Sequence, residues 1–300
     1  MNRPLFSRTT LGEKVFHVVN VCVLTLIMVA TLYPFLNVFA IALNESVDTI
    51  RGGVTLFPRR FTLENFAMIF TYTNMTTAFV NSVFRALIGT FAGLAACSML
   101  AYTLSRRDFR ARKFVSVFLA VTMYISGGLI PFFLLIRDLH LMNTFLVYIL
   151  PAIVGAFNVF MIRSFMDNLP GELQESAFMD GASDWTVFWR IILPLCKPVL
   201  ATIALFIAVG QWNSWFDTYL YNGSNTDLTT LQFELQKILQ STQSSQDAVH
   251  SANVMNNAQR VSPDSIKMAI TIVTIVPILL VYPFLQRYFV SGMTLGAVKA

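Results

Sequence analysis

Six long apolar runs, separated by more polar stretches, dominate this sequence. A helix needs roughly 20 apolar residues to cross a bilayer. The runs are continuous, whereas the strands of a membrane barrel alternate apolar and polar positions. The pattern therefore predicts an all-α integral membrane protein with six transmembrane helices. The predicted helices cover about residues 15–43, 78–104, 114–136, 144–166, 198–222 and 266–290.

The composition supports this prediction. Apolar residues make up 55% of the chain and charged residues 12%, whereas about a quarter of the residues are charged in soluble domains. The first apolar run follows a basic start (Arg3, Arg8 and Lys14), as a secretory signal does. The run is too long for a signal, and no clear cleavage site follows it, so we interpret it as a retained helix.

Basic residues near the helix ends predict the orientation in the membrane. Residues 105–113 (SRRDFRARK) hold five basic side chains in nine positions, which places this short loop in the cytoplasm. Both termini and residues 167–197 then lie on the same side. The outer face receives residues 44–77, 137–143 and 223–265. The net charge of +5 follows from this topology and does not indicate nucleic-acid binding.

The sequence lacks the motifs of a catalytic or metal-binding chain. It contains no phosphate-binding GxxxxGK[ST] loop, no HExxH motif and no serine nucleophile elbow. Its three cysteines and three histidines lack the spacing of metal ligands. We therefore expect a chain that is not an enzyme and that binds no metal or cofactor itself.

Ionisable residues inside the apolar runs are sparse. Arg85 lies one to two turns inside the second run, where it either snorkels to the membrane surface or lines a water-filled path. Asp217 lies near the outer end of the fifth run. No acidic residue lies deep inside a run, so the sequence gives little support to a proton or sodium relay.

The polar island at residues 167–197 predicts two short helices joined by a turn. Pro170 suits the first turn of a helix, and Gly181 suits its left-handed end. Ser183 can cap a second helix, which has an apolar stripe at helical spacing. We expect a stiff elbow on the cytoplasmic face, with an amphipathic hairpin resting on lipid headgroups as the alternative. The stripe consists of Trp185, Phe188, Ile191 and Ile192.

The island also resembles a known signature. The signature is similar to the EAA motif of permease subunits in binding-protein-dependent ABC importers. It consists of Glu175-Ser176-Ala177, then Gly181, and ends with Ile191-x-Leu193-Pro194. Asp180-Gly181-Ala182 together with Phe188 resembles the carbohydrate branch, which includes the maltose-type permeases. Ser176 replaces the usual second alanine, a small change in size. The resemblance runs from about residue 75 to the end, with Trp212-Asn213 and Gly296-Ala297-Val298-Lys299 among its matches.

The resemblance implies a type I ABC importer permease fold, with a core over residues 75–300 and an N-terminal helix and outer loop over 1–74. In that family the elbow is a coupling helix that sits in a cleft of an ATPase subunit. Glu175 would pair with a basic residue of the ATPase, and Trp185 and Phe188 would be apolar anchors. The coupling residues carried over by position are Glu175, Ser176, Ala177, Asp180, Gly181, Ala182, Trp185, Phe188 and Pro194.

The resemblance also implies partners and a location. These are a second permease subunit, two ATPase subunits that use ATP and Mg²⁺, and an extracytoplasmic solute-binding protein. The chain would be a multi-pass protein of the bacterial cytoplasmic (inner) membrane. Its C-terminal tail would reach the ATPase dimer interface, with a disordered tail as the alternative.

The longest outer stretch, residues 223–265, contains leucines and isoleucines at helical spacing from Leu231 to Leu239. We expect a short amphipathic helix there, with a flexible connector as the alternative. The last membrane helix then starts at Ser262-Pro263-Asp264. The resemblance implies that this stretch docks the solute-binding protein, and residues 44–77 could share the docking.

A sugar path needs aromatic faces with amide and hydroxyl groups, and polar side chains in membrane helices face the bundle interior. Each candidate could instead hydrogen-bond a neighbouring helix. Residues 126–143 resemble the subgroup that carries complex or acidic oligosaccharides. The candidate path residues are Asn81, Arg85, Tyr124, Asn158, Trp212, Asn213 and Trp215.

These observations predict a permease subunit of an ATP-driven carbohydrate importer that forms half of the translocation path. Two alternatives stay open at this point. An ion-coupled secondary carrier would need a deep acidic site and commonly an internal repeat, and the sequence shows neither. A membrane scaffold for a cytosolic partner would tolerate loss of the substrate path.

Overall fold

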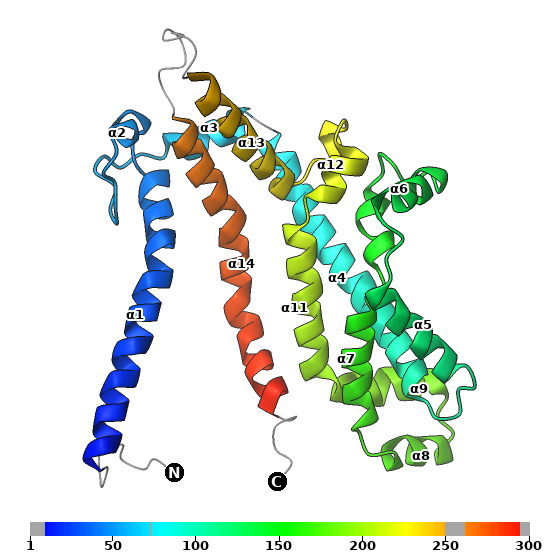
Figure 1. Ribbon diagram of the computed structural model, residues 1–300. Coiled ribbons are helices and arrows are strands. Elements are labelled where there is room, and N and C mark those ends of the chain that lie inside the picture. The colour runs from blue at the N-terminus through cyan, green and yellow to red at the C-terminus, as the bar shows by residue number, and fades with distance from the viewer. Residues whose placement is uncertain (1–9, 73, 250–261, 295–300) are drawn as a thin grey trace. The chain divides into compact units, whose positions relative to one another are not determined.

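The computed structural model describes residues 10–72, 74–249 and 262–294 (Figure 1). Helices make up the regular structure of these residues, apart from one isolated bridge between Asn44 and Phe61. The helices are α1 (Leu11–Ala42), α2 (Ser46–Ile50), α3 (Glu64–Tyr72), α4 (Met75–Ser105), α5 (Arg112–Tyr124), α6 (Leu129–Asp138), η1 (Phe145–Tyr148), η2 (Leu150–Ala152), α7 (Ala156–Asp167), α8 (Glu172–Met179), α9 (Asp184–Val187), η3 (Phe188–Ile192), α10 (Leu193–Leu195), α11 (Lys197–Asn213), α12 (Phe216–Asn222), η4 (Thr226–Leu228), α13 (Leu231–Val249) and α14 (Pro263–Thr294).

The chain divides into two compact units. One contains residues 1–72 and 241–273, and the other contains residues 73–240 and 274–300. The division into residues 1–74 and 75–300 expected from the resemblance stays a prediction.

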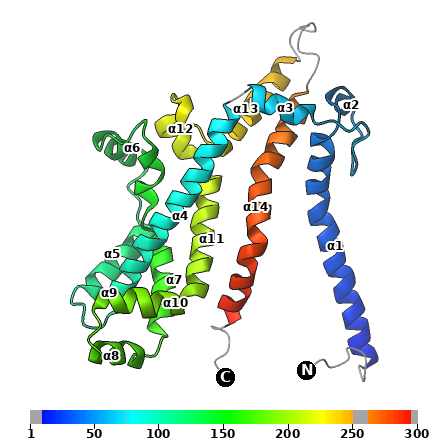
Figure 2. The same ribbon diagram turned by 180° about the vertical axis from the view of Figure 1, so that it is seen from behind.

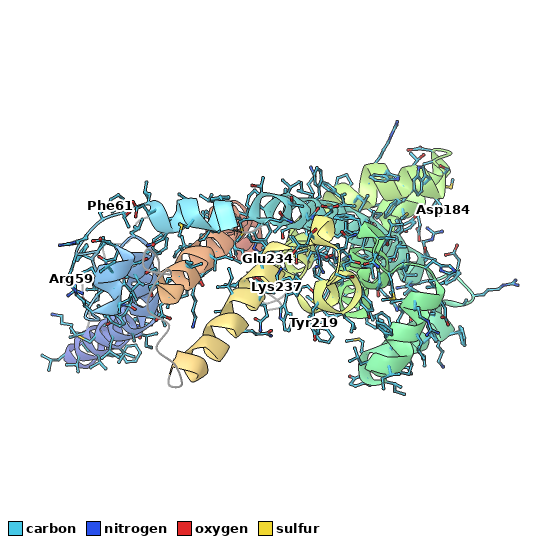
Figure 3. All side chains as sticks on the ribbon, turned by 90° about the horizontal axis from the view of Figure 1, so that it is seen from above. Arg59, Phe61, Asp184, Tyr219, Glu234 and Lys237 are labelled. Atoms are coloured by element: carbon cyan, nitrogen blue, oxygen red, sulfur yellow. The ribbon has the colours of Figure 1, made fainter. Side chains whose placement is uncertain are left out.

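In the first unit, α1 begins with a capping box between Thr10 and Glu13. The loop after α1 is ordered by Asn44, whose side-chain oxygen accepts the backbone N–H groups of Arg59 and Arg60 at 2.8 and 2.9 Å. Arg59 also pairs with Asp48 at 2.9 Å. Asn44 and Arg59 together hold the pKa of the Asp48 carboxyl below its ordinary value. Figure 3 labels Arg59 and Phe61 on this folded loop.

In the second unit, α4 is the central helix, and both α7 and α11 pack along it (Figures 1 and 2). The helix has 31 residues and is therefore about 46 Å long. A Cβ atom at Gly89 would lie only 2.8 Å from the Gln211 side chain of α11, so the missing side chain allows this close approach. The apolar core between these helices includes Cys97, Ala101, Leu104, Val159, Ile162, Val199 and Ile203.

Each of the six predicted membrane segments contains helix, but two of them are bent and a third is interrupted near its end. Within the described residues α1, α4 and α14 are long and apolar enough to cross a membrane unbroken. The predicted span 114–136 breaks at Ile125–Gly128, where α5 and α6 meet at 118°. The span 144–166 bends by 49° between η2 and α7. The span 198–222 ends its helix α11 at Asn213, and α12 follows separately.

The second unit has two distinct ends. The 106–111 loop and helices α8 to α10 lie at one end, and α6, α12 and the start of α13 lie at the other (Figures 1 and 2). At the latter end, the Asn143 N–H donates to the Tyr221 carbonyl at 3.3 Å. Glu234 and Lys237 of α13, both labelled in Figure 3, form an ion pair at 2.6 Å. Within this unit, the structure therefore separates the loops as the basic-residue pattern predicts.

Candidate functional site

Residues 172–195 form a bent arm, which we call the elbow arm. Its first helix, α8, ends in a Schellman turn. The Ala182 N–H donates to the Ala177 carbonyl at 2.9 Å, and the Gly181 N–H donates to the Phe178 carbonyl at 3.0 Å. Gly181 has φ +80°, a left-handed conformation that glycine adopts without strain. The turn predicted at Gly181 is confirmed.

The second half of the elbow arm begins at a capped helix. The Thr186 N–H donates to the Ser183 hydroxyl at 3.3 Å, so Ser183 is the predicted N-cap of α9. The helix then passes into a π-helical turn, η3, and through α10 around Pro194. The segment Asp184–Leu195 meets α11 at 83°. The arm is therefore a sequence of short, individually fixed turns joined directly to a membrane helix.

The inner face of the elbow arm is buried against α4. Phe188 is 2% exposed, and its ring lies 5.1 Å from that of Tyr102. Ala177 is 9% exposed and faces the same core. This corrects the expectation that Phe188 is an apolar anchor for a partner. Phe188 and Ile192, the first and last residues of the π-helical turn, are buried, while Trp185 is exposed, so the predicted stripe does not form one face.

Arg106, at the end of α4, joins both halves of the elbow arm. Its guanidinium donates to the Gln174 side chain at 3.2 Å and lies 3.6 Å from the Asp184 carboxylate. It also lies 4.8 Å from the centre of the Phe178 ring, a cation–π distance. Its hydrogen bonds to Asp108 hold the pKa of that carboxyl below its ordinary value. In the sequence, Arg106 indicates only the orientation in the membrane, and no local pattern predicts these contacts.

The outer face of the elbow arm is exposed and mixes apolar and acidic groups. Met179 is 88% exposed, Trp185 60% and Trp189 50%. Glu175 is exposed on the same arm and forms no ion pair with any residue that the structure describes. Large apolar side chains beside unpaired charge at a protein surface indicate an interaction site. Ser176, Asp180 and Pro194 are also exposed, and Ala182 is half-buried.

Arg85 neither snorkels nor lines an open path. It is 3% exposed, and its guanidinium forms a two-pronged ion pair with Asp217, one prong at 3.0 Å. Its Nε donates to the Gln211 side chain at 2.8 Å, and the Tyr148 ring lies 4.6 Å away. The positive charge is therefore neutralised inside the second unit, where it joins α4, α11 and α12. This corrects both interpretations made from the sequence.

Two more candidate path residues have internal hydrogen bonds. Asn81 donates to the carbonyl oxygens of Asp227 and Thr229 at 2.8 and 2.9 Å. Trp212 is 8% exposed, and its indole N–H donates to the Thr274 carbonyl at 3.0 Å. These side chains hold segments of the second unit together, which is the alternative that the sequence left open.

The four remaining candidates keep accessible side chains. Tyr124 is 88% exposed, Asn213 is exposed, and Asn158 and Trp215 are half-buried. None of the four lines the cavity at residues 107–117 or the cavity beside Tyr219 and Tyr221. Their role in a substrate path stays a prediction. The C-terminal motif Gly296-Ala297-Val298-Lys299 and residues 250–261 of the outer stretch lie outside the described residues.

Comparison with known proteins gives a consistent picture. The profile of the family "Binding-protein-dependent transport system inner membrane component" matches residues 87–295. Protein LplC of Bacillus subtilis is 37% identical, over 97% of each chain. The polygalacturonan/rhamnogalacturonan transport system permease YtcP of the same organism is 35% identical, over 89% of this chain and 92% of that protein.

A solved structure is also similar. The chain matches one described as a bacterial ABC transporter involved in the import of the acidic polysaccharide alginate. The TM-score is 0.83 and the identity 27%, over 96% of this chain and all of that one.

Proposed function

Because this chain belongs to the binding-protein-dependent transport system inner membrane component family and is a carbohydrate permease subunit of an ABC importer, we propose that an ATPase subunit drives it through the elbow arm. The observation on which this proposal rests is the two-sided build of the arm. One face is fixed to α4 by Phe188 and Arg106, and the other exposes Trp185, Met179 and Glu175. A partner that binds the outer face is therefore mechanically coupled to α4 through the contacts of the inner face.

The path of the force follows from the contacts. A displacement of α8 and α9 acts on the end of α4 through the Arg106 contacts and the Phe188–Tyr102 pair. It acts on α11 through the direct 83° connection after Leu195. The two helices pack on each other, and a contact remote from the elbow arm, between Arg85 of α4, Gln211 of α11 and Asp217 of α12, also links them. The elbow arm therefore moves α4 and α11 as a pair.

The partners follow from this mechanism. We place the elbow arm, the 105–113 loop and both termini in the cytoplasm, where the ATPase subunits use ATP and Mg²⁺. A second permease subunit supplies the other half of the path, and a solute-binding protein delivers substrate to residues 44–77 and 223–265. The separation of the loops to opposite ends of the second unit supports this orientation.

The proposed substrate is an oligosaccharide. Relatives are named for polygalacturonan/rhamnogalacturonan and for alginate, so uronic-acid oligosaccharides are the first candidates to test. Arg85 does not supply a cation for their recognition, because Asp217 neutralises it. Tyr124, Asn158, Asn213 and Trp215 offer the aromatic and amide groups on the path. Transport assays with acidic and neutral oligosaccharides of equal length distinguish the two substrate classes.

The elbow-arm proposal is tested by co-purification and uptake. Trp185→Asp removes the exposed ring, and Glu175→Lys inverts the unpaired charge; both positions are exposed, so the fold is retained. Aromatic anchors at interface centres are commonly worth about 2 kcal/mol or more. We therefore expect ATPase association in detergent to fall at least tenfold for Trp185→Asp, with uptake lost in parallel.

Ser176→Ala is the matched control on the same helix, and it restores the more common residue of the motif. We expect this variant to bind and transport as the unmodified protein does. Wild-type association and uptake in both Trp185→Asp and Glu175→Lys would show that the elbow arm is not the docking site.

A further inference from the structure

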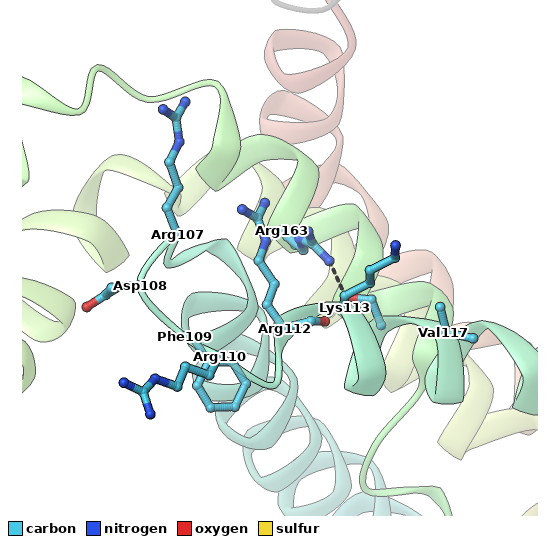
Figure 4. Close-up of a pocket in the computed structure, with 9 residues that line it drawn as sticks. Arg107, Asp108, Phe109, Arg110, Arg112, Lys113, Val117 and Arg163 are labelled. Carbon is cyan, nitrogen blue, oxygen red and sulfur yellow. Dashed lines mark hydrogen bonds between the residues drawn. The ribbon is translucent and has the colours of Figure 1, made fainter.

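A basic cavity lies beside the elbow arm but is not part of it. It has a volume of about 520 Å³ and lies between the 106–111 loop, the start of α5 and the end of α7 (Figure 4). Asp108 is the single acidic side chain among its nine lining residues. Such an excess of positive charge in one hollow favours an anionic ligand. The cationic lining residues are Arg107, Arg110, Arg112, Lys113 and Arg163.

The cations in this cavity exceed the acidic groups near them. Arg112 and Arg163 share one carboxylate, Asp167, at 3.5 and 3.4 Å. Arg163 also donates to the Ser116 hydroxyl at 2.7 Å, the dashed contact in Figure 4. These contacts fix two guanidinium groups side by side, an arrangement that suits the oxygens of a phosphate.

The other cations have no partner of their own. Arg107, Arg110 and Lys113 form no ion pair with any of the residues described in the structure. Asp108, the acid of the cavity, is already bound by Arg106 at 3.0 Å. The positive charge of the cavity is therefore available to a ligand from outside the chain.

The cavity continues into an apolar surface that faces outward. Val117 lines the cavity and is 55% exposed, and Phe114 and Phe118 on the same helix are 75% and 60% exposed. This helix, α5, belongs to one of the predicted membrane segments. A soluble anion gains nothing from such a surface, whereas a phospholipid has acyl chains to lay against it. Basic pockets where membrane helices meet the aqueous phase are suited to anionic headgroups.

We propose that this cavity binds the headgroup of an anionic phospholipid, with the acyl chains along Phe114 and Phe118 of α5. The phosphate lies beside Arg112 and Arg163, and the unpaired charges of Arg107, Arg110 and Lys113 supply most of the attraction for the anionic headgroup. The proposal rests on the membrane placement of the chain and not on docking of the elbow arm, so either one can fail alone.

The test measures lipid preference at the cavity in the complete transporter complex. A fluorophore is attached at Val117→Cys in a Cys22→Ser background, since Cys97 and Cys196 are buried. The complex is placed in nanodiscs with brominated phosphatidylglycerol or brominated phosphatidylcholine, which quench the fluorophore on contact. We expect the wild type to prefer phosphatidylglycerol about tenfold. The triple variant Arg107→Gln/Arg110→Gln/Lys113→Gln leaves the Asp167 ion pairs intact. In this variant we expect the preference to fall to about twofold or less.

The control removes two exposed cations that lie outside both the cavity and the elbow arm, in Lys14→Gln/Lys197→Gln. It should keep the preference. Native mass spectrometry of the unlabelled complex should show phosphatidylglycerol retained in the wild type and lost in the cavity variant.

Three results would overturn the proposal. The first is equal quenching by both lipids, and the second is relief of quenching by excess inorganic phosphate, which would assign the cavity to a free anion. The third is quenching that appears only after the ATPase subunits are removed, which would assign the cavity to a protein partner.

Discussion

Arg85 lies in the first half of α4 and Arg106 directly follows its last residue, and each joins this helix to another part of the second unit. Arg106 contacts α8 and α9 through Gln174 and Asp184. Arg85 contacts Gln211 and Asp217 from within the membrane segment. The two residues are alike in chemistry, yet one lies at an aqueous surface and the other in a nearly water-free site. Their energetic contributions therefore differ.

The Arg85–Asp217 pair can be tested by a double-mutant cycle. Asp217→Asn leaves a buried guanidinium without its counter-charge, which costs about 3–5 kcal/mol. We expect the unfolding temperature in detergent to fall clearly, and Arg85→Gln/Asp217→Asn to recover most of the loss because no charge is then left unpaired. Equal unfolding temperatures for Asp217→Asn and wild type would contradict the described pairing.

The Gly181 turn can be tested by substitutions that differ only in their tolerance of positive φ. No atom lies within 4 Å of a Cβ added at Gly181, so the cost is purely conformational. We expect Gly181→Asn to be mild and Gly181→Val to cost about 1–2 kcal/mol of local stability, with a matching loss of ATPase association.

Gly171 is the control for this substitution. It is equally open but has φ −61°, so Gly171→Ala should be neutral. Full ATPase association in Gly181→Val would mean that the arm does not need this turn.

These two sites differ in what the sequence could reveal. The turn at Gly181 depends on hydrogen bonds between residues at most five positions apart, so local spacing was enough to predict it. Arg85 finds Asp217 across 132 positions. One chain without pairing information cannot reveal such a contact, and the sequence therefore left Arg85 between two interpretations that are both wrong.

At the scale of elements, Arg106 is the link that should separate binding from transmission. Arg106→Gln removes the ion pair to Asp184 and the contact with the Phe178 ring, together worth about 1–2 kcal/mol at a partly exposed site. The outer face with Trp185 and Met179 is untouched. We expect ATPase association within about twofold of wild type and several-fold less substrate imported per ATP hydrolysed.

Arg107→Gln is the matched control, because it removes the same charge one position away and Arg107 forms no ion pair with any residue that the structure describes. Two results would argue against a transmitting role for Arg106. One is an unchanged uptake per ATP hydrolysed in Arg106→Gln, and the other is an equal decrease in Arg107→Gln.

The helices themselves were predictable in position but not in shape. Apolar length located six segments, yet the break at Ile125–Gly128 and the bend between η2 and α7 divide two of them. A break inside an apolar run does not change the composition of the run, so apolar length cannot reveal it. The packing that stabilises such a break involves residues distant in the sequence. Phe188 is a similar case, because it lies in the core although the sequence predicted an anchor for a partner.

At the scale of the whole molecule, the function came from the EAA signature and not from the fold class. A chain of six apolar segments is compatible with carriers, scaffolds and importers alike. The family match over residues 87–295 and the carbohydrate permeases among its relatives decide between these classes. The fold adds the anchored inner face and the free outer face of the elbow arm, which no linear motif contains.

The most direct test of this account is photo-crosslinking from the outer face of the elbow arm. A benzoylphenylalanine at Met179, which is 88% exposed, is activated in membranes that contain the assembled transporter. The same group at Phe114, 75% exposed on α5, serves as the comparison. We expect a crosslink from Met179 to the ATPase subunit and from Phe114 to lipid. A crosslink from Met179 to phospholipid, or to no partner at all, would contradict it.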